Sequence, residues 1–513
     1  MTATDVATPD RQRTLVIGGE VWSGKEFNRV DLEIQAGRIA GIGRFSSTSG
    51  DVLISAEGML VVPGFSNGHT HTHNVFARGY LDVGCLEMLM NIQPAAAENR
   101  SADDTYWAAS LNALANLKAG TTAVCDQFVC LPHISLEHVS AVVQAYVDLG
   151  LRATVSPLVA DRSFWPLIRP YLGDLPLVLE DFMHARAAKQ VNLNNVEQCV
   201  KEWQSVSERV SVAVSPLIPV LCSDRLLEGC ASIAELYGTN VYMHTAESFV
   251  QSTISRDVYG RSIIEHLASI GMLSDRSVLA HGVWLSDRDL DLIADANAIV
   301  VHNPTSNMRL GSGIAPVREM LRRGVRVALG TDGVACSDHQ SIFEAMRMAA
   351  VVSRVRSTDQ SEWLTCSEAF AMGAETGYDA LEPGGAGQNG RIAVGRRADL
   401  VLISRSTPWL HPDNDRITQL VLAGSEAAVD TVLVGGEVVF ARGRALRVDE
   451  ERIYARVDEA ALRLRARNRV EWENATRLAP FIARGSMRMS PSSISAVPHA
   501  SGRSPLTLPG VDA

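Results

Sequence analysis

Short β-rich runs broken by glycine open the hydrophobic pattern of the chain. Between residues 14 and 62, apolar and polar positions alternate in brief stretches such as TLVIGGEVW and VDLEI, which predict antiparallel strands joined by tight turns. The same pattern of short β-rich runs and glycine turns recurs near residues 390–440, in GRIAVGRRADLVLIS and VDTVLVGGEVVFARG. We therefore predict one small β-sandwich domain built from both chain ends, residues 1–62 and 390–445.

The long middle segment has a different pattern, in which apolar β-branched runs alternate with stretches of helical periodicity. Such alternation is typical of a parallel sheet whose strands are connected by helices. The runs that we interpret as strands cover residues 59–64, 121–126, 151–159, 209–217, 240–244, 277–281, 298–303 and 326–332. Eight such units without a GxGxxG turn favour a closed (β/α)8 barrel of the TIM type over an open doubly wound sheet. The predicted fold class is α/β, with the barrel over residues 63–389.

Two further segments follow the second β-rich region. Residues 446–483 carry apolar positions at helical spacing among many charges, which predicts a C-terminal helix. Residues 484–513 are rich in serine, proline and glycine and have little to bury, so we expect a flexible tail.

Composition narrows the range of partners. The chain has 513 residues, and 47 lysines and arginines stand against 58 aspartates and glutamates, a net charge of −11. This acidic balance argues against nucleic acid or a membrane surface as a partner and leaves a small molecule as the expectation. The first residues lack a signal-peptide pattern, no run approaches the ~20 apolar residues that span a bilayer, and the eight cysteines form no CxxC pair. We expect a cytoplasmic protein with reduced thiols.

Potential metal ligands stand at the ends of several predicted strands, and strand ends carry the active site in barrels of this type. His69 and His71 follow the first strand, His244 ends the fifth, and Asp332 ends the eighth. The spacing of His69 and His71 places both imidazoles on one side of an extended segment, although this pair alone fits two solvated loop histidines better than a metal site. Three imidazoles and one carboxylate together supply a site for one divalent ion, with a position left for water.

With these motifs in view, the chain resembles the amidohydrolase superfamily, in its branch of cytosine deaminase, S-adenosylhomocysteine deaminase and chlorohydrolase-like s-triazine hydrolase. The resemblance covers about residues 14–445 and rests on PGFSNGHTH, GTTAVCD, MHTAE, LAHG, HNPTSNMRLGSGIAPV, LGTDG and the two late β-rich stretches. It implies catalytic roles for Glu247 and His281, and a homodimer or higher homo-oligomer. It also implies one divalent metal, zinc most often and iron in some members, on His69, His71, His244 and Asp332.

These residues can perform hydrolytic attack on an sp2 ring carbon. A divalent ion lowers the pKa of bound water to about 7, which gives hydroxide at neutral pH. Asp332 and His281 are placed to accept the water proton, and Glu247 to protonate a ring nitrogen and then the leaving group. We predict a deaminase that releases ammonia or an amine from an amino- or alkylamino-heterocycle, such as a triazine, a pyrimidine, or a purine- or pterin-like ring.

Several alternatives stay open. The same site could hydrolyse a carbon–halogen, urea or amide bond, or could deaminate an adenosyl nucleoside. A non-catalytic scaffold is the remote alternative, because all four ligand candidates and both acid/base candidates are present.

Two departures from the adenosyl-deaminating members favour a smaller or more apolar substrate. Leu217 stands where those members have a substrate-binding histidine, and Ala95–Ala97 stand where they place a glutamate that holds ribose hydroxyls. A hydroxyl buried without a partner costs about 1–3 kcal/mol. The candidate substrate-binding residues are His73, Gln127, Leu217, His302 and Asn303. Packing within its loop is the structural alternative for His73, and helix capping is the alternative for the polar residues after the strands.

Overall fold

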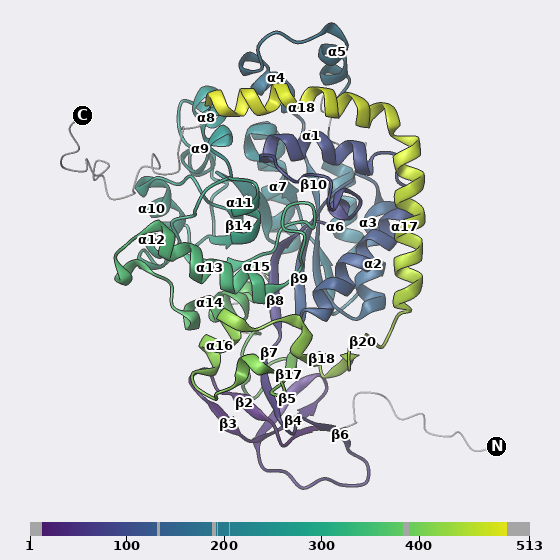
Figure 1. Ribbon diagram of the computed structural model, residues 1–513, viewed down its shortest axis with the longest axis vertical. Helices are drawn as coiled ribbons and strands as arrows, with labels where there is room; N and C mark the ends of the chain where they lie inside the picture. Colours follow the sequence, from purple (N-terminus) through teal and green to yellow (C-terminus); the bar gives the residue numbers. More distant parts are fainter. Residues whose placement is uncertain are drawn as a thin grey trace.

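The computed structural model of the protein describes residues 13–130, 134–186, 191, 193–204, 206–382 and 389–489. A barrel of parallel strands is stacked on a β-sandwich, which lies at the bottom of Figure 1. Two long helices near the C-terminus run along the side of the barrel and across its top. The predicted α/β fold, a barrel with a sandwich formed by both chain ends, is confirmed.

The sandwich contains two sheets whose strands come from both ends of the chain. Its strands are β1 (Thr14–Ile17), β2 (Glu20–Trp22), β3 (Phe27–Arg29), β4 (Asp31–Gln35), β5 (Arg38–Gly43), β6 (Val52–Ser55), β7 (Met59–Pro63), β17 (Leu400–Ser404), β18 (Val429–Val434), β19 (Glu437–Ala441) and β20 (Arg444–Ala445). One sheet has the order β5-β4-β1-β6 and the other β20-β19-β18-β17-β7-β2-β3. Leu32, Val61, Leu402 and Leu433 are buried in one shared core, so apolar burial holds the two ends together.

The barrel is built from parallel strands that follow one another along the chain. They are β8 (Phe65–Thr70), β9 (Thr121–Val129), β10 (Arg152–Val159), the short pair β11 (Val210–Val212) and β12 (Ser215–Pro216), β13 (Val241–Thr245), β14 (Ser277–His281), β15 (Ile299–His302) and β16 (Arg326–Leu329). Pairing is parallel within β8–β12 and within β13–β16. A parallel bridge between Val214 and Val241 joins the two halves. The Asp332 amide donates to the His69 carbonyl at 2.9 Å and closes the ring.

The first barrel strand differs from the expectation. Residues 59–64 were expected to form it, but β7 pairs with β17 and β2 in the sandwich, and β8 is the first strand of the barrel. Gly64 lies between them, where a Cβ atom would stand 2.1 Å from the Thr122 hydroxyl. The chain passes from one sheet to the other without a polar loop, so the apolar run MLVVPGF gives no signal of the boundary.

Helices surround the barrel and cover its mouth. They are α1 (Leu86–Ala97), α2 (Ala102–Lys118), α3 (Leu136–Leu149), α4 (Trp165–Ile168), α5 (Leu177–Ala185), α6 (Leu193–Trp203), α7 (Asp224–Tyr237), α8 (Phe249–Tyr259), α9 (Ile263–Ser269), α10 (Asp287–Asp295), α11 (Pro304–Arg309), α12 (Val317–Arg322), α13 (Ile342–Arg356), α14 (Cys366–Gly373), α15 (Glu375–Leu381) and α16 (Arg416–Ala423). Within the described part of the chain, none of the helices is long and apolar enough to cross a membrane.

The C-terminal region contains two helices rather than one. Helix α17 covers Glu450–Arg467 and α18 covers Arg469–Met489, so residues 484–489 are helical where a flexible tail was expected. Asn468 stands between them with a buried side chain, whose amide donates to the carbonyls of Ala95 and Glu98 at 3.1 and 2.7 Å. The remainder of the expected tail, 490–513, lies outside the described residues.

Candidate metal and catalytic site

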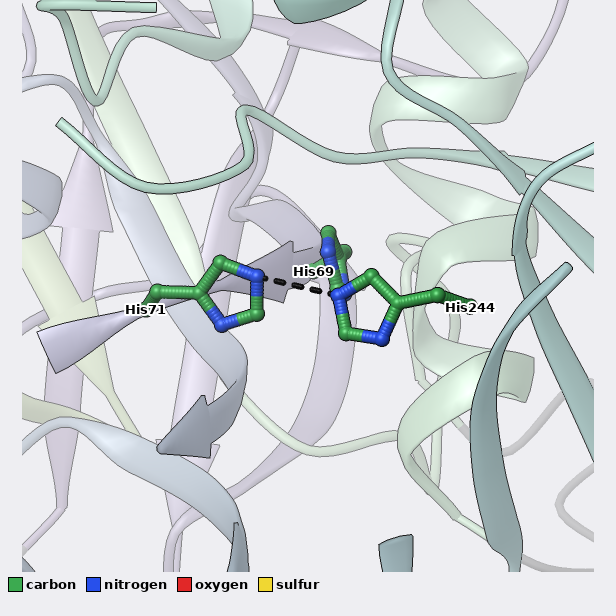
Figure 2. Close-up of side chains that lie close together, drawn as sticks. All are labelled: His69, His71 and His244. Carbon is green, nitrogen blue, oxygen red and sulfur yellow. Dashed lines mark hydrogen bonds between the residues drawn. The ribbon is translucent and has the colours of Figure 1, made fainter. Parts of the chain in front are cut away.

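The predicted metal ligands converge at the carboxyl ends of the barrel strands. His69 lies in β8 with His71 just beyond it, His244 lies in β13, and Asp332 follows β16; all are buried. The ring nitrogens of His69, His71 and His244 lie within 4.8 Å of one another, and the three rings face a common point in Figure 2. Asp332 Oδ1 lies 3.1 Å from His71 Nε2 and 3.6 Å from His69 Nε2. The geometry brings three imidazoles and one carboxylate to one place.

The chemistry of this cluster fits a divalent cation. Among the described residues, His69 Nε2 is a buried nitrogen without a hydrogen-bond partner. Burial lowers the pKa of His69 to about 3 and that of His244 well below its usual range, so both are neutral. Although burial opposes it, the close contacts with His69 and His71 hold the pKa of Asp332 well below its usual range. Neutral imidazoles and an ionised carboxylate are the forms that bind a metal.

Backbone carbonyls orient two of the histidines. His244 Nδ1 donates to the Leu217 carbonyl at 2.7 Å, and His71 Nδ1 donates to the Gln127 carbonyl. A carbonyl oxygen only accepts, so the proton of each ring stays on Nδ1 and the lone pair of Nε2 points toward the centre of the cluster. Such outer hydrogen bonds fix the tautomer that a metal ligand needs.

The Gln127 side chain orients the third histidine. Its amide lies 2.9 Å from His69 Nδ1 and 3.2 Å from Ser215 Oγ. As placed, the amide nitrogen faces His69 and the amide oxygen faces Ser215, whose hydroxyl can donate either to that oxygen or to the Tyr242 carbonyl at 3.0 Å. The hydroxyl has one proton, so it can serve only one of the two acceptors. The reverse orientation of the amide lets the Ser215 hydroxyl donate to Tyr242 and accept from the amide nitrogen. It also puts the amide oxygen on His69 Nδ1, which leaves the His69 Nε2 lone pair free for a metal.

Backbone conformation at the site is unusual. Ala246, His281 and Asp332 have φ values of +48°, +76° and +61°, in the left-handed region that non-glycine residues rarely adopt. Each such residue costs of order 1 kcal/mol and persists only where the surroundings enforce it. Here the left-handed conformation changes the direction of the chain at the strand ends, so that the His281 and Asp332 side chains point into the barrel mouth.

Two further titratable groups face the cluster. His281 Nε2 lies 3.6 Å from Glu247 Oε2 and 4.0 Å from Asp332 Oδ2, and its Nδ1 donates to Asn307 Oδ1 at 3.0 Å. Burial raises the pKa of Glu247 well above its usual range, and the charges of Asp332 and Glu87 raise it further. Glu247 therefore retains a proton at pH values where an ordinary carboxyl group is ionised, and His281 offers an unpaired nitrogen.

A cavity of about 530 Å³ opens above these groups. His71, His244, Glu247 and Asp332 form its floor. Its walls are largely apolar and come from α1, from the segment after β10 and from the β12 end, through Leu86, Leu89, Met90, Val129, Leu158, Phe164, Trp165, Leu217, Ile218 and Leu221. A cavity of this size and lining is typical of a small-molecule site.

The structure separates the expected substrate-binding residues into two groups. His73 and Leu217 line the cavity, and His73 Nδ1 accepts from the Val129 amide at 3.1 Å. Gln127, His302 and Asn303 are buried and do not line it. Gln127 lies behind His69, because alternation along β9 turns it into the barrel interior. Asn303 packs against Gly330, and a Cβ atom added to Gly330 would come within 2.3 Å of Asn303 Oδ1. Asn303 is therefore enclosed in the interior of the barrel.

The loop after the first strand also differs from the expectation. Ala95–Ala97 are buried within α1 and do not line the cavity, whereas Pro94 and Glu98 do. A carboxylate therefore reaches the cavity one position beyond the alanine run. Helical periodicity does not predict this position, because Glu98 is the C-cap just beyond the end of α1 and has an extended backbone.

Comparison with known proteins places the chain among hydrolytic enzymes. The profile of the Amidohydrolase family matches residues 60–439. A 5'-deoxyadenosine deaminase of Methanothermobacter thermautotrophicus is 31% identical over 88% of this chain and 98% of its own length. A 5-methylthioadenosine/S-adenosylhomocysteine deaminase of Caldanaerobacter subterraneus subsp. tengcongensis is 29% identical over 86% and 95% of the two chains.

Solved structures show the same fold at lower identity. An atrazine chlorohydrolase from Arthrobacter aurescens complexed with zinc superimposes with a TM-score of 0.78, at 23% identity, over 87% of this chain and 100% of its own. An adenosine deaminase from Xanthomonas campestris with bound zinc has a TM-score of 0.76, at 23% identity, over 90% and 100% of the two chains. With the family match and the cluster of buried ligands, the chain belongs to the amidohydrolase family and is a metal-dependent hydrolase that acts on carbon–nitrogen bonds.

Proposed function

We propose that this enzyme deaminates an amino- or alkylamino-substituted nitrogen heterocycle, with Glu247 as the proton donor. The observation that carries the proposal is the position of Glu247 at the floor of a largely apolar cavity, beside the ligand cluster and 3.6 Å from the buried His281. Proton donor, proton acceptor and ligand cluster are the parts that hydrolytic deamination requires.

The proposed ligands of one divalent ion, zinc by preference, are His69, His71, His244 and Asp332. When bound, such an ion activates water as a nucleophile at neutral pH. Asp332 Oδ1 accepts from the Gly333 amide at 2.7 Å and Oδ2 from the Ser306 hydroxyl at 2.6 Å, so both oxygens of the carboxylate are held in place. This rigidity preorganises the ligand set.

The proton steps follow from the positions of three side chains. We assign Asp332 Oδ2 and His281 Nε2 as acceptors of the proton from the attacking water, since both face the cluster. Glu247 Oε2 donates its proton to a ring nitrogen, which makes the neighbouring carbon more electrophilic. The proton that Asp332 or His281 took from the water then passes to the leaving amine, and Glu247 regains a proton from the added hydroxyl as the C=O bond forms. The raised pKa of Glu247 suits this role as an acid.

The cavity favours a heterocycle that carries a large substituent. A bare triazine or pyrimidine would leave much of the 530 Å³ unfilled. Leu217 and the aromatic wall accommodate an apolar group, while Glu98 can accept hydrogen bonds from hydroxyls. We therefore propose adenine nucleosides with an apolar 5' group as the first class to test, a class that matches the names of the two similar deaminases.

Alkylamino-triazines and alkylamino-pyrimidines are the second class, and the specific observation in their favour is Leu217. Its apolar side chain lines the cavity, and its carbonyl accepts a hydrogen bond from His244 Nδ1. A wall of this kind gains about 0.8 kcal/mol for each methylene it buries. Substrates with a carbon–halogen, urea or amide bond are included in the screen described next, because the ligand cluster does not discriminate among leaving groups.

An ammonia-release screen tests the proposal. Zinc-loaded and iron-loaded enzyme is offered 5'-modified adenosines, free aminopurines, aminopyrimidines, aminopterins and alkylamino-triazines, with released amine, urea and chloride products followed in parallel. We expect ammonia or amine release from at least one class. Release of chloride or cleavage of amides alone would overturn deamination, and absence of all turnover with less than one metal equivalent would favour a scaffold. Light scattering on the same preparation tests the proposed homo-oligomer.

A further inference from the structure

Helix α18 covers the mouth of the barrel. It runs across the top of the molecule directly over α1, with α4 and α5 on its other side (Figure 1). It contacts α1 and α5, which border the cavity, α8, which follows Glu247, and the short turn at Arg169–Tyr171. The family match ends at residue 439, so this helix lies outside it.

The last turn of α18 reaches a buried carboxylate. Glu87, in the first turn of α1, is 2% exposed, and both of its oxygens accept hydrogen bonds from hydroxyl groups. Ser486 of α18 donates to Oε2 at 3.3 Å, and Ser248 donates to Oε1 at 2.8 Å. A buried carboxylate is costly to desolvate, so its hydrogen bonds are hard to give up. Glu87 therefore connects the C-terminal helix to the segment that follows His244.

Ser248 connects this link to Glu247. It is the N-cap of α8, and its hydroxyl accepts from the Gln251 amide at 3.2 Å. The Gln251 side chain in turn accepts from the Glu247 amide at 3.0 Å and donates to Glu247 Oε2 at 3.4 Å. The cap of α8 thus determines where the Glu247 backbone and carboxyl group lie. The left-handed Ala246 directly before them needs such external restraint.

The end of α18 is itself fixed by contacts with another segment. Gly485 packs so closely that a Cβ atom would stand 2.7 Å from Leu172 Cδ2, and Arg488 donates to the Tyr171 carbonyl at 3.1 Å. Ser486 lies between these anchors. Its hydroxyl therefore reaches Glu87 from a fixed position rather than from a loosely held terminus.

We propose that Glu87 is a positioning residue for Glu247, and that Ser486 in the last turn of α18 completes the link. This inference rests on the proposed role of Glu247 as proton donor. Glu87 itself does not line the cavity. It acts by holding the Ser248 cap, so its loss displaces Glu247 while the ligand cluster and most of the cavity wall remain. A displacement of about 1 Å in a proton donor costs up to roughly 100-fold in rate.

The test compares four variants of the full chain: Glu87→Ala, Glu87→Gln, Ser486→Ala and, as a control, Met487→Ala. Met487 is on the same turn but is 75% exposed. We expect Glu87→Ala to lower kcat by about 10-fold to 100-fold with KM within twofold of wild type. Glu87→Gln retains both hydrogen-bonding positions and should recover most of kcat, Ser486→Ala should lose a few-fold, and Met487→Ala should match wild type. Wild-type kcat in Glu87→Ala, or a change confined to KM, would overturn the proposal.

Two truncations and one measurement independent of turnover complete the design. A chain that ends at Met489 should keep wild-type kcat, whereas one that ends at Arg484 removes Ser486 and should lose at least as much as Ser486→Ala. Hydrogen exchange in the segment 246–256 should be faster in Glu87→Ala and in Ser486→Ala, with metal content and circular dichroism unchanged. Unchanged exchange there in Glu87→Ala would overturn the link. Faster exchange in a protein that deaminates nothing would support the link, and the failure would then belong to the proposed function.

Discussion

His71 and His244 meet edge to edge with their Nε2 atoms 3.1 Å apart, in rings that are nearly parallel at 14° (Figure 2). Each ring uses its Nδ1 proton on a backbone carbonyl, so two lone pairs confront each other in a buried site. Asp332 approaches the same point, and its hydrogen bond raises the pKa of His71 although burial opposes this. A metal-free site would relieve the repulsion with a proton, and a bound cation replaces that proton.

Loss of a ligand should therefore remove metal and turnover together. We expect His71→Ala and Asp332→Ala to retain well under one metal equivalent and to lose measurable deamination, since the remaining groups cannot hold a divalent ion as tightly. His184→Ala, which changes an exposed histidine, is the control and should keep its metal. Elemental analysis decides, and full occupancy in Asp332→Ala would show that our ligand set is wrong.

Gln127 should act on the affinity for metal rather than on substrate binding. Gln127→Met preserves volume but removes the acceptor of the His69 Nδ1 proton, and we expect metal affinity to fall by about 10-fold to 100-fold. Gln127→Glu keeps an acceptor and should bind metal at least as well as Gln127→Met. Gln144→Met changes an exposed glutamine and provides the control. Competition with a chelator measures the metal affinity of the wild type and the three variants. Equal affinities in all four would show that Gln127 does not support the metal site as its contacts indicate.

Glu247→Gln should separate metal binding from proton transfer. The amide has the size of the carboxyl group but cannot shuttle a proton, so metal stays bound and kcat falls by about 100-fold or more. In the wild type, burial and the charges of Asp332 and Glu87 raise the pKa of Glu247. The acid form therefore persists as pH rises past the ordinary range of a carboxyl group, and kcat should fall only when the raised pKa is passed. Near-normal turnover of Glu247→Gln would assign the proton to another group.

Substrate preference can be read from Glu98 and Leu217. Glu98→Ala removes the cavity carboxylate, and we expect kcat/KM for 5'-modified adenosines to fall by about 10-fold to 100-fold, the cost of unpaired hydroxyls, with little change for alkylamino-triazines. Leu217→Ala should lower kcat/KM for substrates with apolar substituents, because those substituents then bury less apolar surface. Competition assays on one preparation give these ratios. If Glu98→Ala affected both classes equally, the carboxylate would not be the feature that recognises hydroxyls.

The strand ends carried most of what the sequence could reveal about the site. His244 and Asp332 each end an apolar run, and His69 and His71 follow one within a few residues, so parallel strands bring them together wherever the exact boundaries fall. Alternation within a strand is less informative when both faces are buried. That is why Gln127, expected to contact substrate, instead supports His69 from inside the barrel.

Other features depended on contacts between distant segments. The run from Met59 to Thr70 is continuous in sequence but is divided between two sheets, and only the pairing partners of β7 and β8 reveal the division. Ser486 lies in a stretch whose composition resembles a tail, yet it is helical because α18 has α1 and the Tyr171 turn to pack against. Tertiary packing overrode local composition there.

The most direct test of the account is a metal reconstitution of chelator-treated enzyme. Bound metal and ammonia release are measured in the same samples as zinc is added back, with a substrate identified by the screen. The account predicts that both rise together and reach their plateau at one ion per chain, and that Glu247→Gln follows the same metal curve with almost no ammonia. Ammonia release that survives complete removal of metal, or that appears only after two ions are bound, would contradict a mononuclear deaminase.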